Sequence, residues 1–487
     1  MAIHDMTAWQ LTEQLQARQI TAVEAVQACY DRIDTLDGQV KAFLTLTRES
    51  ALEQARAIDS ARAAGEKLPP TAGLPIAHKD GLSTAAVRTT CASRMLDNYV
   101  PAYDATVVKR CHDAGMIMLG KTNMDEFAMG SSGENSAFQV TANPWDLTRI
   151  PGGSSSGSAA AVAAGEAFVA TGSDTGGSIR QPAALCGLIG LKPTYGRVSR
   201  YGLIAYGSSL DTVGPLCRDV RDAALIMNVI AGHDPRDATS SDVPVPDYTT
   251  GLGADLDGLR AGVVQEILHH DGVDPTVRQT VEQAIEHLSG LGVEIEEIHL
   301  PHVEYSQACY GIIAPAEASS NLARLDGVRY GYRTDSEITD IHDLFAKSRA
   351  ESLGPEVQLR IIRGTYVLSA GQYDAYYMKA LKVRTLIKQE LESALERHDF
   401  LISPTSPVVA SSIGEKTENS MVSRAAATCT KPVNLAGLPA INVPCGLVNG
   451  LPVGMQVIGR PFDEARLLQV AYAYEQATEW HRAHPEL

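Results

Sequence analysis

Short apolar strands alternate with helical segments through the first half of this 487-residue chain. The segments at 73–78, 116–119 and 168–171 have the length and apolar character of buried strands, and apolar residues recur at helical spacing between them. A helix between successive strands is typical of α/β proteins. The alternation therefore predicts an α/β fold with a large mixed or mostly parallel β-sheet.

The rest of the chain predicts a single domain over residues 1–487. Helices are expected first, over 7–35, where Thr21 and Glu24 form a capping box, and over 49–64. Further strands are expected at 185–191, 259–264, 400–403 and 451–458, with helices at 275–290, 315–325 and 376–397 and a final helix capped by Asp463. This order gives N-terminal helices over 1–70, an α/β core over 71–235, a helical elaboration over 240–400 and a return to the core over 400–487.

Composition and charge exclude several classes of protein. The chain has 41 Lys and Arg against 58 Asp and Glu, a net charge of −17, which opposes direct binding to DNA or RNA. It has no apolar run of the roughly 20 residues that a membrane span needs, and its first residues do not resemble a signal peptide, so we expect a cytoplasmic protein without membrane contact. The eight cysteines lack C-x-x-C spacing, which predicts buried reduced thiols and no metal site.

Two short motifs match known patterns but lie in the wrong local context. Residues 115–122 match the phosphate-binding loop Gly-x-x-x-x-Gly-Lys-Thr, yet the four variable positions are bulky and apolar and belong to the predicted strand itself. The pattern Gly153-x-Ser155-x-Gly157 matches the nucleophile elbow of α/β hydrolases, but proline and glycine precede it where that elbow needs a strand. An ATPase built on Lys121 and a nucleophilic Ser155 are therefore the weaker hypotheses.

Ser178 is the stronger nucleophile candidate, because it follows an apolar strand and the run Asp174-Thr175-Gly176-Gly177. The backbone N–H groups of Thr175, Gly176, Gly177 and Ser178 are candidates for an oxyanion hole, since glycines let consecutive N–H groups turn toward one point. No histidine stands out as the base. Lys79 ends an apolar strand, where burial would lower its pKa from about 10.4, and Ser154 could relay a proton between Lys79 and Ser178.

These residues lie in segments that resemble the amidase signature family, GGSSSGS (152–158) and GSDTGGSIR (172–180). The resemblance implies the amidase signature fold, a large mixed sheet between helices, with 71–235 as the catalytic core. It also implies a Ser–Ser–Lys triad in which Ser178 is acylated, Ser154 follows a non-proline cis peptide bond and Lys79 is the base. Four further segments are similar to the glutamine-hydrolysing subunits of tRNA-dependent amidotransferases: GKTNMDEFAMG (120–130), KPTYGR (192–197), EASSNLAR (317–324) and PVNLAGLP (432–439).

The second resemblance implies an activity and partners. Such a subunit releases ammonia from glutamine for Glu-tRNA(Gln) or Asp-tRNA(Asn), and works with subunits B and C. It has no cofactor of its own: ATP and Mg belong to the partner subunit, and tRNA is reached only through that partner. Arg360 and Tyr310 are then expected in the substrate-binding site, with Arg360 on the glutamine α-carboxylate.

Four positions depart from the family pattern. Ala427 replaces the aspartate that would bind the substrate's α-ammonium group, five residues before Pro432. Gly311 stands where a second tyrosine is common, Gly133 where threonine is common and Ser156 where glycine is common. Ala427, which loses the charged contact, and Gly311 together leave open a second hypothesis, a stand-alone amidase acting on an amide without an α-ammonium group.

Overall fold

A single mixed β-sheet runs through the computed structural model, which describes residues 2–415 and 420–487. Parallel pairs, such as β2–β3 and β2–β4, occur beside antiparallel pairs, such as β4–β6 and β10–β11. The prediction of an α/β fold with a large mixed sheet is therefore confirmed. In order across the sheet, the eleven strands of the described residues are β1 (Phe43–Leu46), β3 (Ile117–Thr122), β2 (Pro75–Lys79), β4 (Val169–Asp174), β6 (Thr212–Cys217), β5 (Ile189–Lys192), β10 (Ala440–Val448), β11 (Leu451–Ile458), β9 (Phe400–Pro404), β7 (Arg260–Val264) and β8 (Glu294–Ile298).

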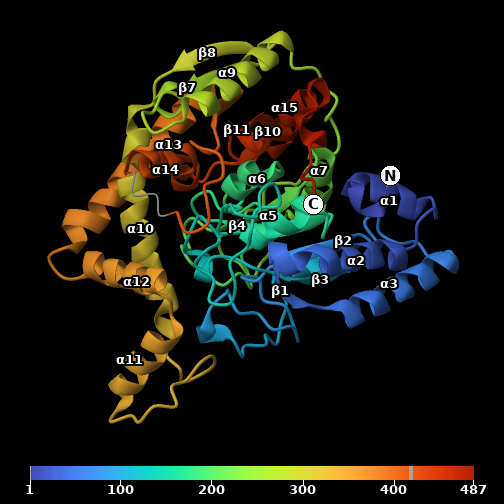
Figure 1. Cartoon of the computed structure of the whole chain (residues 1–487). Helices are drawn as coiled ribbons and strands as arrows, with labels where there is room; N and C mark the ends of the chain where they lie inside the picture. Colours follow the sequence, from blue (N-terminus) through green and yellow to red (C-terminus); the bar gives the residue numbers. More distant parts are fainter. Residues whose placement is uncertain (1, 416–419) are drawn as a thin grey trace.

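Helices enclose this sheet (Figure 1). Two of them, α5 and α6, pack on strands β4, β5, β10 and β11. Helix α15 contacts both α7 and α9, and these three helices pack on strands β6, β10 and β11. Strands β2, β4 and β11 are buried along their whole length, as expected for a sheet covered on both faces. The α-helices are α1 (Ala8–Gln16), α2 (Ala22–Val40), α3 (Arg48–Ala63), α4 (Thr106–Asp113), α5 (Ser156–Ala163), α6 (Arg180–Cys186), α7 (Val220–Ile230), α8 (Gln265–Leu268), α9 (Pro275–Gly290), α10 (Ser306–Asn321), α11 (Ile341–Ser352), α12 (Pro355–Leu368), α13 (Lys379–Arg397), α14 (Ser420–Ala436) and α15 (Glu464–Ala477).

Several predicted boundaries need correction. The helix expected over 7–35 is two helices, α1 and α2, and Arg18 between them has a left-handed φ of 59°. The capping box of Thr21 and Glu24 is present at the start of α2. The strand expected over 185–191 begins only at Ile189, because α6 continues to Cys186. The final helix begins after Asp463 as predicted, but the Asp463 side chain makes no capping hydrogen bond.

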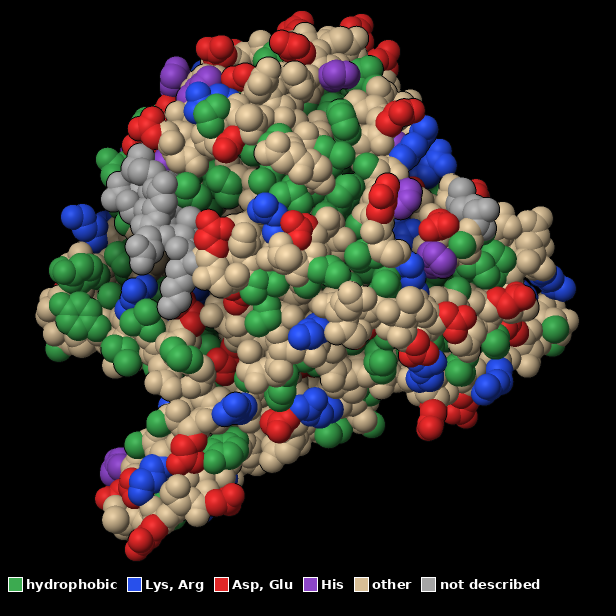
Figure 2. All heavy atoms as spheres, in the orientation of Figure 1, with side chains coloured by type: hydrophobic (Ala, Val, Ile, Leu, Met, Phe, Trp, Pro, Cys, Tyr) green, Lys and Arg blue, Asp and Glu red, His purple; other side chains and the backbone are tan. Residues whose placement is uncertain are grey.

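The second half adds a helical arm to the sheet. Helices α10, α11 and α12 extend away from the body (Figure 1), and α10 packs on α12, α13 and α14. On the face shown in Figure 2, hydrophobic side chains gather over part of this arm. Hydrophobic residues more than 40% exposed include Ile362 and Tyr366 of α12 and, after that helix, Tyr373 and Tyr376. In the described residues, no helix is long and apolar enough to cross a membrane.

Candidate active site

A cavity of about 390 Å³ lies between the glycine-rich loop after β4 and the helices of the arm. Gly176, Gly177 and Ser178 line it on one side. The three residues predicted to bind substrate line it as well: Tyr310 from α10, Arg360 from α12 and Ala427 from α14. The fold therefore brings the nucleophile candidate and the predicted substrate-binding residues, which are up to 249 positions apart in the chain, to one cavity.

Lys79 and Ser154 form a buried pair behind this cavity. Lys79 is the last residue of β2, and its Nζ lies 2.8 Å from Ser154 Oγ, with both residues fully buried. The same ammonium nitrogen lies 3.0 Å from both Ser155 Oγ and Ser173 Oγ. The peptide bond between Gly153 and Ser154 is cis, as the resemblance implied.

Burial lowers the pKa of Lys79 to about 7. The carboxylates of Asp125, Asp174 and Asp211 act in the opposite direction, but they only partly offset the loss of hydration. A lysine with this pKa is largely neutral above neutral pH, so it can accept a proton from a hydroxyl group.

Ser178 occupies the boundary between this buried pair and the cavity. Its residue is 7% exposed, whereas Lys79 and Ser154 are inaccessible. The hydrogen bonds of the described residues include none made by the Ser178 hydroxyl, and the Ser178 carbonyl accepts the N–H of Ser155 at 3.3 Å. Ser178 is therefore the member of the predicted triad that a bound amide can reach.

The predicted oxyanion donors divide into two groups. The N–H of Gly177 donates to Asp174 Oδ1 at 2.7 Å, so it holds the loop and does not point to an oxyanion. In the part of the chain that the structure describes, the N–H groups of Thr175, Gly176 and Ser178 donate to no protein acceptor. Those three remain available to a negatively charged oxygen in the cavity.

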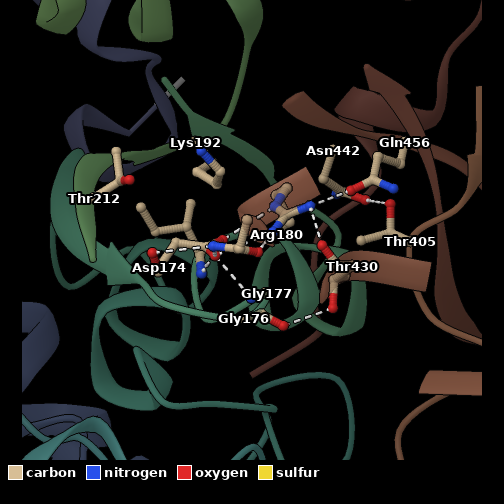
Figure 3. Close-up of polar contacts among 12 residues, drawn as sticks. Asp174, Gly176, Gly177, Arg180, Lys192, Thr212, Thr405, Thr430, Asn442 and Gln456 are labelled. Atoms are coloured by element: carbon tan, nitrogen blue, oxygen red, sulfur yellow. Dashed lines mark hydrogen bonds and ion pairs between the residues drawn. The ribbon is translucent and has the colours of Figure 1, made fainter. Parts of the chain in front are cut away.

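An ion pair between Asp174 and Arg180 lies next to the glycine-rich loop (Figure 3). Asp174 accepts from Arg180 Nε at 3.1 Å and from the N–H of Ile179 at 3.1 Å. Burial alone would raise the pKa of Asp174, but the Arg180 guanidinium lowers it well below its usual range. Arg180 Nη2 also donates to Asn434 of α14 at 2.6 Å, so α14 is tied to the loop.

Glycine is required at two positions of this loop because other elements approach closely. A Cβ atom at Gly176 would lie 2.8 Å from the Tyr310 ring. At Gly177, where φ is +125°, it would lie 2.5 Å from Thr430 Oγ1. The Thr430 hydroxyl donates to the Gly176 carbonyl at 2.7 Å, and Figure 3 shows this contact.

Arg360 is held toward the cavity by two neighbours. Its Nε donates to Glu356 at 2.7 Å, one turn earlier in α12, and its Nη1 donates to the Tyr206 hydroxyl at 2.7 Å. In the described residues, Nη2 has no protein partner. A guanidinium with a free amino group in a cavity can bind a carboxylate.

Lys431 also lines the cavity, and no sequence pattern identified it. Its Nζ lies 2.5 Å from Gln307 Oε1 and 4.8 Å from the centre of the Tyr310 ring. A lysine just before a proline in an apolar helix has no motif of its own. Only the packing of α14 against α10 places it in the same cavity as Arg360.

Two of the four departures from the family pattern, Gly133 and Ser156, compensate for each other in size. A Cβ atom at Gly133, where φ is +82°, would lie 2.6 Å from the Cβ of Ser156. The larger residue at 156 therefore requires glycine at 133. A Cβ atom at Gly311 would meet no atom within 4 Å, so the missing side chain there leaves open space.

The two rejected motifs have structural roles. Lys121 lies within β3, where it is fully buried, donates to the Leu82 carbonyl at 2.8 Å and pairs with Asp80 at 3.3 Å, so its ammonium group is held by the protein itself and not directed at a bound phosphate. Ser155 is also fully buried, with its hydroxyl donating to the Ser173 carbonyl at 3.2 Å, and no strand precedes it. All eight cysteines are buried free thiols, as predicted.

Comparisons with known proteins agree over nearly the full chain. The family model for amidases matches residues 24–468. The A subunit of the glutamyl-tRNA(Gln) amidotransferase of Moorella thermoacetica is 58% identical over 487 residues, which cover 100% of this chain and 99% of that protein. The crystal structure of the corresponding subunit from Thermotoga maritima has 42% identity and a TM-score of 0.80, and the match covers 98% of this chain and 96% of that one. The native peptide amidase of Stenotrophomonas maltophilia has 34% identity and a TM-score of 0.84, with 99% and 98% covered.

Proposed function

This chain belongs to the amidase family, and we propose that it is the glutamine-hydrolysing component of a tRNA-dependent amidotransferase. Its similarity to the A subunits of glutamyl-tRNA(Gln) amidotransferases over their whole length supports this function. The observation that carries the chemistry is the 2.8 Å contact between Lys79 Nζ and Ser154 Oγ, next to Ser155, whose N–H donates to the carbonyl of the cavity residue Ser178.

In the proposed reaction, Ser178 Oγ attacks the carbon of the side-chain amide and passes its proton through Ser154 to neutral Lys79. The N–H groups of Thr175, Gly176 and Ser178 stabilise the charge on the carbonyl oxygen. As the C–N bond breaks, Lys79 returns the proton through Ser154 to the leaving nitrogen, and ammonia departs from an acyl ester on Ser178. Water then cleaves the ester by the same proton route and restores the serine.

The ammonia would serve a partner. We propose that subunits B and C complete the complex and that the partner binds Glu-tRNA(Gln) or Asp-tRNA(Asn) together with ATP and Mg. The net charge of −17 fits a chain that reaches the tRNA only through another protein of the complex. This reaction would take place in the cytoplasm.

The test compares two neighbouring serines. Ser178→Ala in complex with subunits B and C should lose glutaminase activity by at least about a thousandfold and form no acyl-enzyme, detected by intact mass after acid quenching. Ser155→Ala should keep acylation within about tenfold, because Ser154 and Ser173 still contact Lys79. If Ser155→Ala abolished the acyl-enzyme and Ser178→Ala kept it, the nucleophile assignment would be wrong.

Ala427 favours a second function, hydrolysis of an amide without an α-ammonium group by the chain alone. The side chain that lines the cavity at this position carries no charge. Turnover of a panel of simple amides without the partner proteins, together with failure to cleave glutamine even in the complex, would support this function over the first.

A further inference from the structure

Lys431 projects from the same face of α14 as Ala427, because the two residues are four positions apart in one helix. Both line the cavity. Lys431 Nζ donates to Gln307 Oε1 at 2.5 Å, and this is its one hydrogen bond within the described residues. Two of its three N–H donors are therefore available to a ligand.

Lys431 and Arg360 are two cations of the same cavity wall. Lys431 lies above the Tyr310 ring, and Arg360 donates to Tyr206 beside it. Burial lowers the pKa of Lys431 to about 7, and the charge of Arg360 acts in the same direction. A carboxylate bound against both cations would remove this repulsion and keep Lys431 protonated.

The two carboxylates that line the cavity in the described residues, those of Glu134 and Glu415, lie in loops. Glu134 accepts the N–H of Gly414 at 2.7 Å, and Glu415 accepts the N–H of Ser412 at 3.0 Å. Two carboxylates interact with Arg360 on the helical wall: Glu356 pairs with it directly, and the charge of Arg360 also acts on Asp125, which accepts the N–H groups of Gly133 and Asn135. In the described residues, neither carboxylate pairs with Lys431. The wall is therefore suited to a negatively charged group.

We infer that Lys431 is a specificity-determining residue that binds the substrate's carboxylate together with Arg360. This inference rests on the proposed amide hydrolysis at Ser178. The enzyme would recognise the amide substrate mainly through the substrate's carboxylate. An α-ammonium group would contribute little to binding, because Ala427 has no charge to pair with it. The substrate class is then the ω-amides of dicarboxylic acids, whether or not they carry an α-amino group.

Three amides test the inference in the assembled complex: L-glutamine, glutaramate, which lacks the α-amino group, and pentanamide, which also lacks the carboxylate. Wild-type kcat/KM for glutaramate should be within about threefold of that for glutamine or higher. Lys431→Met should lower kcat/KM for both carboxylates at least about tenfold, mainly through KM, and leave pentanamide within about twofold. Lys431→Arg should restore most of the loss. Lys388→Met, on the exposed surface of α13, is the matched control and should change none of the three.

Two results would overturn the inference. One is an equal loss for all three amides in Lys431→Met, which would mean a structural role. The other is a strong preference for glutamine that Glu134→Gln abolishes, which would place an ammonium contact on the loop side. Calorimetry of glutaramate binding separates this inference from the proposed function, because it can be done with the Ser178→Ala variant, which does not hydrolyse the amide. If the wild type fails to hydrolyse glutamine, but adding Lys431→Met to Ser178→Ala still weakens glutaramate binding at least about tenfold, only the proposed function is wrong.

Discussion

In the proposed reaction, Lys79 is the base that activates the Ser178 hydroxyl. It is inaccessible to solvent, and three hydroxyl groups surround its Nζ within 3.0 Å. Hydroxyl groups stabilise an ammonium less than water does, so burial lowers the pKa to about 7. A general base is most effective when its pKa lies near the working pH.

The resulting pH dependence follows from the protonation state that the reaction needs. The base must be neutral, so kcat/KM should rise about tenfold per pH unit below pH 7 and level off above it. Pentanamide is the substrate to use, because the cavity residue Lys431 has a similar pKa and would also affect the binding of a carboxylate. Lys79→Met should remove the pH dependence along with at least about a hundredfold of the rate. A profile of the wild type that is flat between pH 5.5 and 8 would contradict this role of Lys79.

For single residues, the sequence predicts the candidate catalytic groups better than the residues that select the substrate. Lys79, Ser154 and Ser178 stand at strand ends or in glycine-rich turns, where local sequence already suggests exposed backbone N–H groups and a polar cluster. Lys431 has no such local sign, since its place in the cavity depends on the packing of α14 against α10, where Lys431 contacts Gln307 and Tyr310. The hydrogen bond from the Gly177 N–H to Asp174 also cannot be predicted from the sequence, because a carboxylate three residues away can point toward the loop or away from it.

Helix α14 and the loop after β4 act together as one element of the site. Arg180 joins Asp174 of the loop to Asn434 of α14, and Thr430 joins α14 to the Gly176 carbonyl. These contacts fix the distance between Ser178 and the wall that holds Ala427 and Lys431. A change in this coupling should therefore affect catalysis as well as stability.

Thr430→Val tests the coupling without a change in volume. The half-buried Gly176 carbonyl would lose its donor, which should lower the free energy of unfolding by about 0.5–1.5 kcal/mol and kcat by roughly tenfold. Urea denaturation and steady-state kinetics measure the two effects. Thr365→Val is the control, because its hydroxyl bonds to the Ile361 carbonyl on the exposed surface of α12. Equal effects of the two substitutions would argue against a special role of the α14 contact.

Helices and strands can be predicted from the sequence where apolar residues recur with a strong periodicity. They cannot be predicted where tertiary packing determines the local structure. Apolar patterns predict the buried strands β2 and β11 and the helix α9 close to their observed bounds. They do not predict the edge strand β8, because Glu294, Glu296 and Glu297 give it the composition of a solvent-exposed loop. Acidic side chains on an edge strand also hinder pairing with another chain.

At the scale of the whole molecule, the sheet joins strands from residue 43 to residue 458 into one body. Its core also encloses ionisable groups that the proposed reaction does not use. Glu166, between α5 and β4, is fully buried, and neither of its carboxyl oxygens has a hydrogen-bond partner in the described residues. Burial raises the pKa of Glu166 well above its usual range, and Asp37 adds to the effect.

Glu166→Gln should stabilise the protein more at higher pH. The unfolded chain releases the Glu166 proton above about pH 4.3, whereas the folded protein keeps it, so the free energy of unfolding falls as the pH rises. Glutamine has nearly the same shape and no proton to release, so its advantage over the wild type should grow by up to about 1.4 kcal/mol per pH unit. Urea denaturation at pH 5.5 and 7.5 measures this difference, with Glu286→Gln on the exposed face of α9 as the control. An advantage of Glu166→Gln that is the same at both pH values would show that Glu166 is ionised in the folded core.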